Sequence, residues 1–451
     1  MKNKIDLTSG NIRKKLIIFS FPIFFSLLLK TFYELIDMLV VGWYVGSTGI
    51  ASISNVTSLI WLINSIGNGF STAAAILISQ YEGSKDQKKQ LDTINTLGFI
   101  IFFSSILITI FSLIFYKDIL LFLNVPASAI DYTKDYMYIL SFGWVFNFGF
   151  ISIASLIRGF GNSVQPFILM IISAILNMLF DFIFVGLFNL GPAGAALSTI
   201  VVNFISFFMA FYVLKKLYFH SFKFNIFKIK ESNLKPFFTL ATPLIAQMII
   251  VDFSYVVITK MANSYGIIIA SALGIGMQIH NLITLPSRAL SRAVTICTGQ
   301  NFGANKIDNV KKVLHSGIYL GIIITTVLTL IFNLFSKPIL SLFDTNPDVI
   351  IQSQTYMIYC CSLDCILFSI RNAYNHFASG LGNTKFSCVN SIAGPVVLRI
   401  ALCYCLVHIF DFGFLGIYIG ITLSSIIPAI TGFLYFKFSK WDTKTKISPL
   451  H

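Results

Sequence analysis

The stretch KTFYELIDMLVVG, from Lys30 to Gly42, places three ionisable side chains inside an otherwise apolar segment of the chain. Lys30, Glu34 and Asp37 are separated by four and three residues, which puts their side chains on one face of a helix. A charged side chain costs about 2.5–3.5 kcal/mol at the centre of a lipid bilayer, so it needs a partner or a function there. A carboxylate in such a position can bind a cation or hold a proton.

Further ionisable residues occur in apolar segments of the second half: Asp252, Arg288, Arg292, Asp364, Arg371 and Arg399. Arg288 and Arg292 are four residues apart and share a helical face, and a guanidinium group suits carboxylate or phosphate better than an ammonium group does. We expect Lys30 and Glu34 to form an ion pair, with direct contacts to substrate in a charged cleft as the alternative. The six residues of the second half are expected to line the same substrate cleft, and the two arginines lead to the hypothesis that the substrate carries an anionic group. In the alternative, the arginines pair with Asp252 and Asp364.

The composition indicates a membrane protein. Of the 451 residues, 56% are hydrophobic and 11% are charged, whereas a soluble domain has roughly 25% charged residues. The apolar runs are long enough to cross a hydrocarbon core of about 30 Å and too continuous for barrel strands. We therefore expect an all-α polytopic membrane protein with twelve transmembrane helices. The expected spans are 15–45, 49–79, 91–116, 131–160, 164–187, 191–219, 234–264, 270–300, 309–335, 350–378, 386–411 and 414–438.

The net charge of +14 reflects membrane topology and not a nucleic-acid site. Basic residues gather in both terminal tails and in the segments 81–92 and 215–236, which all fall on one side of the membrane if the helices alternate. Because cytoplasmic loops are enriched in Lys and Arg, we expect a multi-pass protein of the plasma (inner) membrane with both termini in the cytoplasm. The expected partners are the lipid bilayer and a small-molecule substrate, without nucleic acid.

The second half of the chain repeats the first at an offset of about 221 residues. FSFPIFFSLL corresponds to LATPLIAQMI, SQYEGSKD to GQNFGANK, RGFGNSVQP to SGLGNTKFS, and NLGPAGAALST to DFGFLGIYIGIT. Each half holds six expected helices, and this even number gives both halves the same orientation, as in the parallel repeats of secondary transporters. We expect an N-lobe at 1–219, a cytoplasmic interfacial linker at 220–236 and a C-lobe at 237–451.

These repeated motifs, together with DLTSGNIRKKLIIFSFPI, YELIDMLVVGWYVG and SAILNMLFDFIF, resemble the prokaryotic transporters of the multidrug and toxic compound extrusion (MATE) family. The resemblance extends from LTSG to the twelfth helix. It implies two pseudo-symmetric six-helix lobes around a central cleft, and antiport that exports small organic compounds, drugs or metabolites, in exchange for H⁺ or Na⁺. It implies no cofactor besides the coupling ion. We expect a monomer that is not an enzyme.

The resemblance also implies a cation or proton coupling site in the N-lobe. The family forms this site from an Asp fifteen residues after the first-helix proline, an Asn and an Asp four residues apart on the fifth helix, and a Thr on the sixth. The matching residues are Asp37, Asn177, Asp181 and Thr199. At a rise of 1.5 Å per residue, both aspartates and the threonine fall in the outer half of the membrane. The C-lobe has Ile258, Leu398 and Leu402 at the positions equivalent to Asp37, Asn177 and Asp181.

Two prolines and two histidines interrupt the apolar pattern. Pro22 and Pro243 each remove a backbone hydrogen bond in the first helix of a lobe, and we expect them to be fixed kinks or hinges. His280 and His376 are interpreted as packing residues, with a proton relay as the alternative. The seven cysteines lie in apolar segments without metal-ligand spacing, which indicates small apolar side chains rather than disulfides or a metal site.

Three other functions are weighed against antiport. A flippase for a lipid-linked precursor, within the same superfamily, is favoured by fourteen helices rather than twelve. An intramembrane enzyme needs a positioned nucleophile or metal set, and the chain has neither an HExxH nor a GxSxG motif. A channel needs a filter-like loop between helices, and no such loop interrupts the expected helices.

Overall fold

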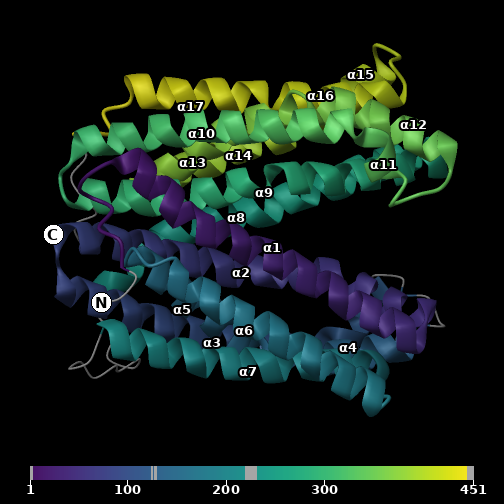
Figure 1. The fold of residues 1–451 in the computed structure, drawn as a ribbon, viewed down its shortest axis with the longest axis horizontal. Helices are drawn as coiled ribbons and strands as arrows, with labels where there is room; N and C mark the ends of the chain where they lie inside the picture. Colours follow the sequence, from purple (N-terminus) through teal and green to yellow (C-terminus); the bar gives the residue numbers. More distant parts are fainter. Residues whose placement is uncertain (1–3, 123–124, 126–128, 219–230, 444–451) are drawn as a thin grey trace. The chain divides into compact units, whose positions relative to one another are not determined.

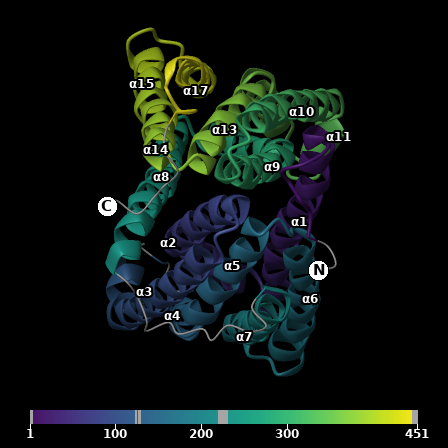
Figure 2. The ribbon, with the colours of Figure 1, turned by 90° about the vertical axis from the view of Figure 1, so that its left-hand side faces the viewer.

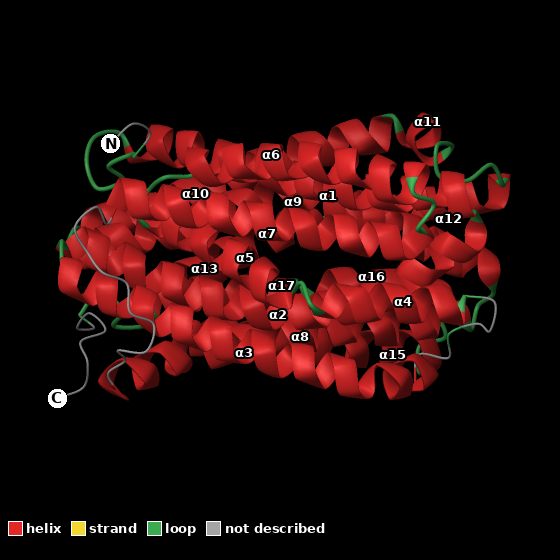
Figure 3. Ribbon diagram, turned by 90° about the horizontal axis from the view of Figure 1, so that it is seen from below, coloured by secondary structure: helices red, strands yellow, loops and turns green. Residues whose placement is uncertain are grey.

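The structure is a computed structural model that describes residues 4–122, 125, 129–218 and 231–443. Within these residues every regular element is a helix, and no strand occurs (Figure 1 and Figure 3). The expected all-α polytopic class is therefore confirmed.

The first half of the described chain contains α1 (Ile12–Val45), α2 (Ser47–Ser84), α3 (Gln87–Phe122), α4 (Ile130–Ser141), α5 (Trp144–Gly159), α6 (Val164–Asp181), the π-helix η1 (Phe182–Leu187) and α7 (Gly191–Tyr218). The second half contains α8 (Glu231–Asn263), α9 (Ile267–Gly303), α10 (Ile307–Leu334), α11 (Ser336–Leu340), α12 (Pro347–Tyr356), η2 (Met357–Cys361), α13 (Asp364–Gly380), α14 (Thr384–Ile392), η3 (Ala393–Leu398), α15 (Arg399–His408), α16 (Phe414–Ser424) and α17 (Ile426–Phe438).

Within the described residues, ten helical segments are long and apolar enough to cross a membrane by themselves, and they match ten of the expected spans. The expected span 131–160 is the pair α4 and α5, which are bent by 55° at a break beside Gly143. The expected span 350–378 is formed by α12, η2 and α13 and is interrupted beside Leu363. The fourth span of each half is thus broken at an equivalent position.

The helices form two compact units, which we call unit 1 and unit 2. Among the described residues, unit 1 contains residues 4–6 and Phe25–Ala241, and unit 2 contains Leu7–Phe24 and residues 242–443. In unit 1, α2, α3 and α5 pack against one another, and in unit 2 α9, α10 and α13 do so (Figure 2). Both unit boundaries fall inside continuous helices, one within α1 and one within α8.

The sequence repeat recurs in the backbone. Among the described residues, ten of the eleven positive φ angles form five pairs separated by about 221 residues, and Gly10 (67°) is the exception. The pairs are Gly46 (80°) and Gly266 (92°), Lys85 (59°) and Asn305 (58°), Gly161 (87°) and Gly382 (88°), Asn189 (53°) and Asp411 (57°), and Gly191 (57°) and Gly413 (58°). Because few L-residues adopt this conformation, the matched pairs mean that helices end and chains turn in the same way in both halves. The pseudo-symmetric repeat is confirmed.

The two glycine-rich stretches of the repeat are turns between helices. In each, an asparagine accepts a hydrogen bond from the backbone of the next helix: Asn162 Oδ1 from Gln165 N at 3.1 Å, and Asn383 Oδ1 from Phe386 N at 3.2 Å. A side-chain oxygen at this position satisfies one of the amides that the first turn of a helix leaves without a partner.

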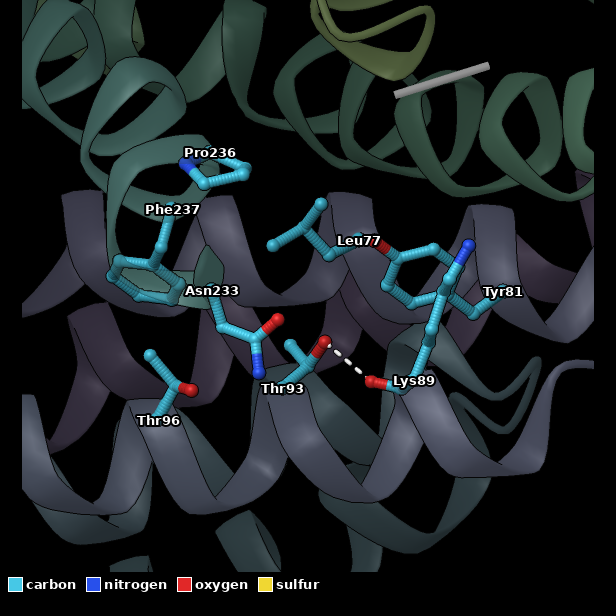
Figure 4. A pocket seen from close by; sticks show the side chains of 8 residues that line it. All are labelled: Leu77, Tyr81, Lys89, Thr93, Thr96, Asn233, Pro236 and Phe237. Atoms are coloured by element: carbon cyan, nitrogen blue, oxygen red, sulfur yellow. Dashed lines mark hydrogen bonds between the residues drawn. The ribbon is translucent and has the colours of Figure 1, made fainter. Parts of the chain in front are cut away.

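The expected linker 220–236 lies mostly outside the described residues, which resume at the start of α8. The first turns of α8 are anchored in unit 1. Phe237 is buried and stacks on Phe70 with ring centroids 6.2 Å apart. Figure 4 shows Asn233 beside a small pocket that Thr93 of α3 and Tyr81 of α2 also line. This segment therefore fixes the entry into α8 by apolar packing.

Most of the cysteines pack as small apolar side chains. Cys360, Cys361, Cys365 and Cys403 are fully buried in the apolar core of unit 2, where they contact Tyr356 and other large side chains. Their placement agrees with the apolar role expected from the sequence.

A glycine substitution tests the turns of the repeat. Gly382→Ala forces a side chain into the left-handed region, and we expect it to destabilise the folded protein by about 1–2 kcal/mol. The measurement is the thermal unfolding midpoint of the purified protein in detergent. Gly274→Ala is the matched control, because a Cβ at this helical position meets open space and Ala favours a helix over Gly. Equal midpoints for Gly382→Ala and wild type would contradict the expectation.

Candidate functional site

Two carboxyl groups from distant parts of the sequence meet in unit 1. Asp37 of α1 and Asp181 at the end of α6 lie close enough for their side chains to interact directly. Asp181 is fully buried, and both of its carboxyl oxygens, like Asp37 Oδ1, lack a hydrogen-bond donor among the described residues. Two adjacent carboxylates without donors repel each other strongly in a low-dielectric environment, so the pair requires a cation or a bound proton.

Asn177 lies one helical turn before Asp181 and is held by α7. Its Nδ2 donates a hydrogen bond to Ser198 Oγ at 3.1 Å, and Ser198 Oγ donates to the Asn177 carbonyl oxygen, also at 3.1 Å. These bonds orient the amide and leave Asn177 Oδ1 buried without a donor among the described residues. The expected Thr199 is the next residue and is half-buried. The hydroxyl group that touches Asn177 therefore belongs to Ser198, which the sequence analysis missed.

The backbone explains why α6 and α7 approach so closely. Asp181 ends α6, and the π-helix η1 follows at once; single π-helical turns are frequent at functional sites. A Cβ at Gly194 would lie 2.8 Å from the backbone carbonyl carbon of Phe184, so only glycine allows this packing of α7 against η1. Ser198 lies one turn beyond Gly194, and the close packing brings its hydroxyl group to Asn177.

Two tyrosines complete the surroundings of the carboxyl pair. Tyr33 of α1 lies near Asp37 and Glu34, and the buried Tyr136 of α4 lies near both aspartates. Tyr33 precedes Asp37 by one helical turn, so its helical face could be read from the sequence. Tyr136 gave no such signal, because only the packing of α4 brings it to the pair.

The expected ion pair on α1 is present. Lys30 Nζ lies 3.5 Å from Glu34 Oε1, and the two side chains are 40% and 45% exposed. An exposed i,i+4 pair contributes about 0.3–0.5 kcal/mol, so it stabilises the helix only slightly. A direct role of Lys30 and Glu34 toward substrate stays a prediction.

Unit 2 contains a different charged cluster at the contact between α9 and α13. His280 Nε2 lies 2.9 Å from Asp364 Oδ2, and both side chains are buried. His280 was expected to be a packing residue, and its partner is 84 positions away in the sequence. His376 is also satisfied, since its Nδ1 lies 2.8 Å from Thr295 Oγ1.

The arginines of unit 2 contact aromatic rings and neutral polar groups. Arg288 Nη2 donates to Asn281 Oδ1 and Thr284 Oγ1, and the Arg288 and Arg371 guanidinium carbons lie 5.7 and 5.1 Å from the Phe368 ring centre. Arg399 lies 4.8 Å from the Tyr255 ring centre. Within the described part of the chain, none of these arginines has an ion pair within 4.0 Å. The close pairing with Asp252 and Asp364 that the sequence left open is thus absent there, although longer-range attraction remains.

The other predicted residues are divided between the units. Lys30 and Glu34 belong to unit 1, whereas Asp252, Arg292 and the rest of the proposed substrate set belong to unit 2. Asp252 and Arg292 are exposed. Pro22 lies inside α1 two residues before the unit boundary, and Pro243 inside α8 just after the other boundary.

A double-mutant cycle tests the contact between α6 and α7. We expect Ser198→Ala to destabilise the protein by about 1 kcal/mol, because it removes the hydrogen bonds with Asn177. The losses from Ser198→Ala and Asn177→Ala should be non-additive, as for residues in contact. The measurement is thermal stability in detergent. Ser206→Ala is the control, because the Ser206 hydroxyl group pairs with Ser173 on the same two helices, and its effect should add to that of Asn177→Ala. Additive losses for Ser198 and Asn177 would contradict the geometry.

Known proteins resemble this chain over most of its length. "Probable multidrug resistance protein YoeA" of Bacillus subtilis is 27% identical over 436 residues, which cover 95% of this chain and 94% of that protein. "Multidrug export protein MepA" of Staphylococcus haemolyticus is 23% identical over 399 residues, covering 87% and 86%. The solved structure of a MOP superfamily transporter from Pyrococcus furiosus has a TM-score of 0.89 at 19% identity and covers 96% of this chain and 97% of that one.

The MatE family model matches the chain twice, at residues 22–183 and 243–405. The matches begin at Pro22 and Pro243, the two prolines that the repeat relates, so each half matches the model separately. The two matches cover well over half of the sequence. The chain therefore belongs to the MatE family and is a multi-pass membrane transporter, not an enzyme.

Proposed function

We propose that the protein is a secondary antiporter that exports small organic compounds in exchange for H⁺ or Na⁺ by alternating access. The coupling site is the cluster of Asp37, Asn177 and Asp181 with the neighbouring hydroxyl groups of Ser198 and Thr199. The observation that carries the proposal is the contact of two carboxyl groups, with buried oxygens that lack donors, inside membrane-spanning helices of unit 1.

The chemistry of the donor set suits either coupling ion. Two carboxylates and the Asn177 amide oxygen can replace the hydration shell of Na⁺, a hard cation that binds oxygen. The same carboxylates can hold one shared proton, because neighbouring carboxylates in a low dielectric do not both ionise. In both cases the bound cation removes the repulsion within the pair.

Coupling follows from the effect of each ligand on the conformational equilibrium. A cation bound between α1 and α6 favours the arrangement in which Asp37 meets Asp181, and a substrate favours another. Each ligand shifts the equilibrium only by its differential affinity for the two states. The unit boundaries beside Pro22 and Pro243 support a hinge in α1 and α8, because proline removes a backbone hydrogen bond there.

The flippase is the less favoured alternative. The related "Multidrug export protein MepA" and "Probable multidrug resistance protein YoeA" support export of small compounds instead. We propose that the transporter works as a monomer in the plasma membrane.

The orientation with both termini in the cytoplasm is supported by the basic residues near both ends. We expect a green fluorescent protein fused after His451 to fluoresce and an alkaline phosphatase fused there to be inactive, because each reporter folds on only one side of the membrane. The opposite pattern would reverse the orientation.

An exchange assay tests the coupling site. Purified protein in liposomes is given a pH gradient or a Na⁺ gradient, and uptake of fluorescent cationic and anionic compounds is followed. We expect one gradient to drive uptake in wild type, and Asp37→Asn to abolish it, because the variant removes one carboxylate of the pair. Asp181→Asn should abolish uptake for the same reason.

In the same assay, Pro22→Ala should slow uptake without changing the ion that drives it.

Asp131→Asn is the matched control, since Asp131 lies outside the cluster and pairs with Lys134 on the surface of α4. Uptake that persists unchanged in Asp37→Asn under the driving gradient would remove Asp37 from the coupling site. Lipid scrambling without gradient-driven movement of any compound would favour the flippase.

A further inference from the structure

The charged cluster in unit 2 carries more positive than negative charge. Four arginines on α9, α13 and α15 accompany two aspartates, Asp252 and Asp364. Arg399 is 2% exposed, Arg371 is 5% exposed, and Asp364 is 2% exposed. A guanidinium group stays charged in a protein, so the surplus cannot be removed by loss of a proton. Burying an ion without a counter-ion costs several kcal/mol.

Asp364 is the only carboxylate near the two deepest arginines in the described part of the chain. One of its oxygens is already engaged by His280, and Arg371 and Arg399 lie near enough to repel each other. Arg399 touches Tyr255 through its ring and its hydroxyl group. Asp364 can therefore compensate at most one of the two guanidinium groups.

Several guanidinium donors in this cluster are buried without a hydrogen-bond partner among the described residues. They are Nε and Nη1 of Arg399, Nη1 of Arg371 and Nε of Arg288. A buried donor without an acceptor costs about 1–3 kcal/mol, and more when it is charged. An oxyanion satisfies such donors and the charge together, because the planar guanidinium fork matches the two oxygens of a carboxylate or phosphate.

The four arginines differ in their exposure to solvent. Arg292 is exposed and Arg288 is half-buried, and both lie on α9, whereas Arg371 and Arg399 are buried. Phe368 of α13 contacts both Arg288 and Arg371 through its ring. Arg288 is fixed by Asn281 and Thr284, two turns and one turn earlier on α9. The Phe368 ring thus contacts Arg288 and Arg371, and Arg371 in turn lies near Arg399.

We propose that Arg288, Arg371 and Arg399 form a binding site in unit 2 for one oxyanion, the carboxylate or phosphate group of the transported compound. The aromatic rings of Phe368 and Tyr255 keep the guanidinium groups in place, and Arg292 attracts the anion from the exposed end. The assignment rests on the proposed transport function, because it names the class of compound that the antiporter carries. It adds that the anionic group of the compound binds in unit 2, whereas the pair of Asp37 and Asp181 lies in unit 1.

Equilibrium binding tests this site without any ion gradient. The full-length protein in nanodiscs of phosphatidylcholine is titrated calorimetrically with benzoate, phenyl phosphate, the neutral benzamide and the cationic benzylamine, in chloride-free buffer. We expect benzoate or phenyl phosphate to bind and the neutral and cationic analogues not to bind. Arg371→Gln and Arg399→Gln should weaken binding of the anion about tenfold or more, as the loss of a charge-assisted hydrogen bond does.

Arg13→Gln is the matched control. Arg13 also belongs to unit 2 and lies over an aromatic ring, that of Tyr319, but it is exposed near the start of α1. If Arg399→Gln does not fold, Arg399→Lys keeps the charge and removes the planar fork. Arg371→Gln then gives a second reading: the anion should raise the thermal unfolding midpoint of wild type and Arg13→Gln, but not of Arg371→Gln.

The proposal would be overturned by benzamide binding as strongly as benzoate, by no binding of either anion, or by an equal loss of anion binding in Arg13→Gln. Displacement of benzoate by phosphatidylglycerol in the nanodiscs would assign the arginines to a lipid headgroup and also overturn the substrate assignment. Binding is measured without a gradient, so the two proposals can fail separately. If the anion binds but no gradient drives exchange, only the antiport mechanism is rejected. If exchange occurs but anion binding does not depend on the arginines, only this site is rejected.

Discussion

Ionisable side chains in apolar helices need a partner of opposite charge, and the arrangement of this molecule depends on that requirement. Asp37 and Asp181 in unit 1 meet without donors for their oxygens, so they require positive charge. Arg371 and Arg399 in unit 2 share one carboxylate, so they require negative charge. The two units thus present opposite electrostatic demands within one chain. A transporter can use such sites because uncompensated buried charge raises the free energy of the empty site, and binding of an oppositely charged ligand lowers it.

The two halves repeat the backbone but not the chemistry. Left-handed residues, capping asparagines and the break in the fourth span recur at matching positions. These features depend on local backbone geometry, which the fold needs in both halves. The charged residues differ, because Ile258, Leu398 and Leu402 replace the members of the acidic site, and Ile258 is packed in the apolar core of unit 2. The repeat therefore supplies a scaffold on which each unit carries a different set of charged residues.

Two helices, α1 and α8, are divided between the units, and in each case the first turns belong to one unit and most of the helix belongs to the other. Leu7–Phe24 belongs to unit 2 although the remainder of α1 belongs to unit 1, and α8 has the reverse arrangement. These helices are covalent connections that each unit holds by apolar packing, as at Phe237 and Phe70. A helix that is anchored in both units and contains a proline near the boundary is suited to bending there, since proline leaves a carbonyl group without its usual donor.

The sequence by itself determined the membrane class, the positions of the spans and the repeat, because hydrophobic length and turn residues are local properties. It also gave the Lys30–Glu34 pair, which depends only on helical spacing. Tertiary structure decided which side chains meet between helices. The contact of Asn177 with Ser198 depends on how Gly194 lets α7 approach η1, and His280 reaches Asp364 only through the packing of α9 on α13. The rotation of each helix about its axis is set by packing, and neighbouring residues such as Ser198 and Thr199 point in different directions. For this reason the sequence indicated that Asp37, Asn177 and Asp181 belong to one candidate site, but not that Ser198 contacts Asn177 there.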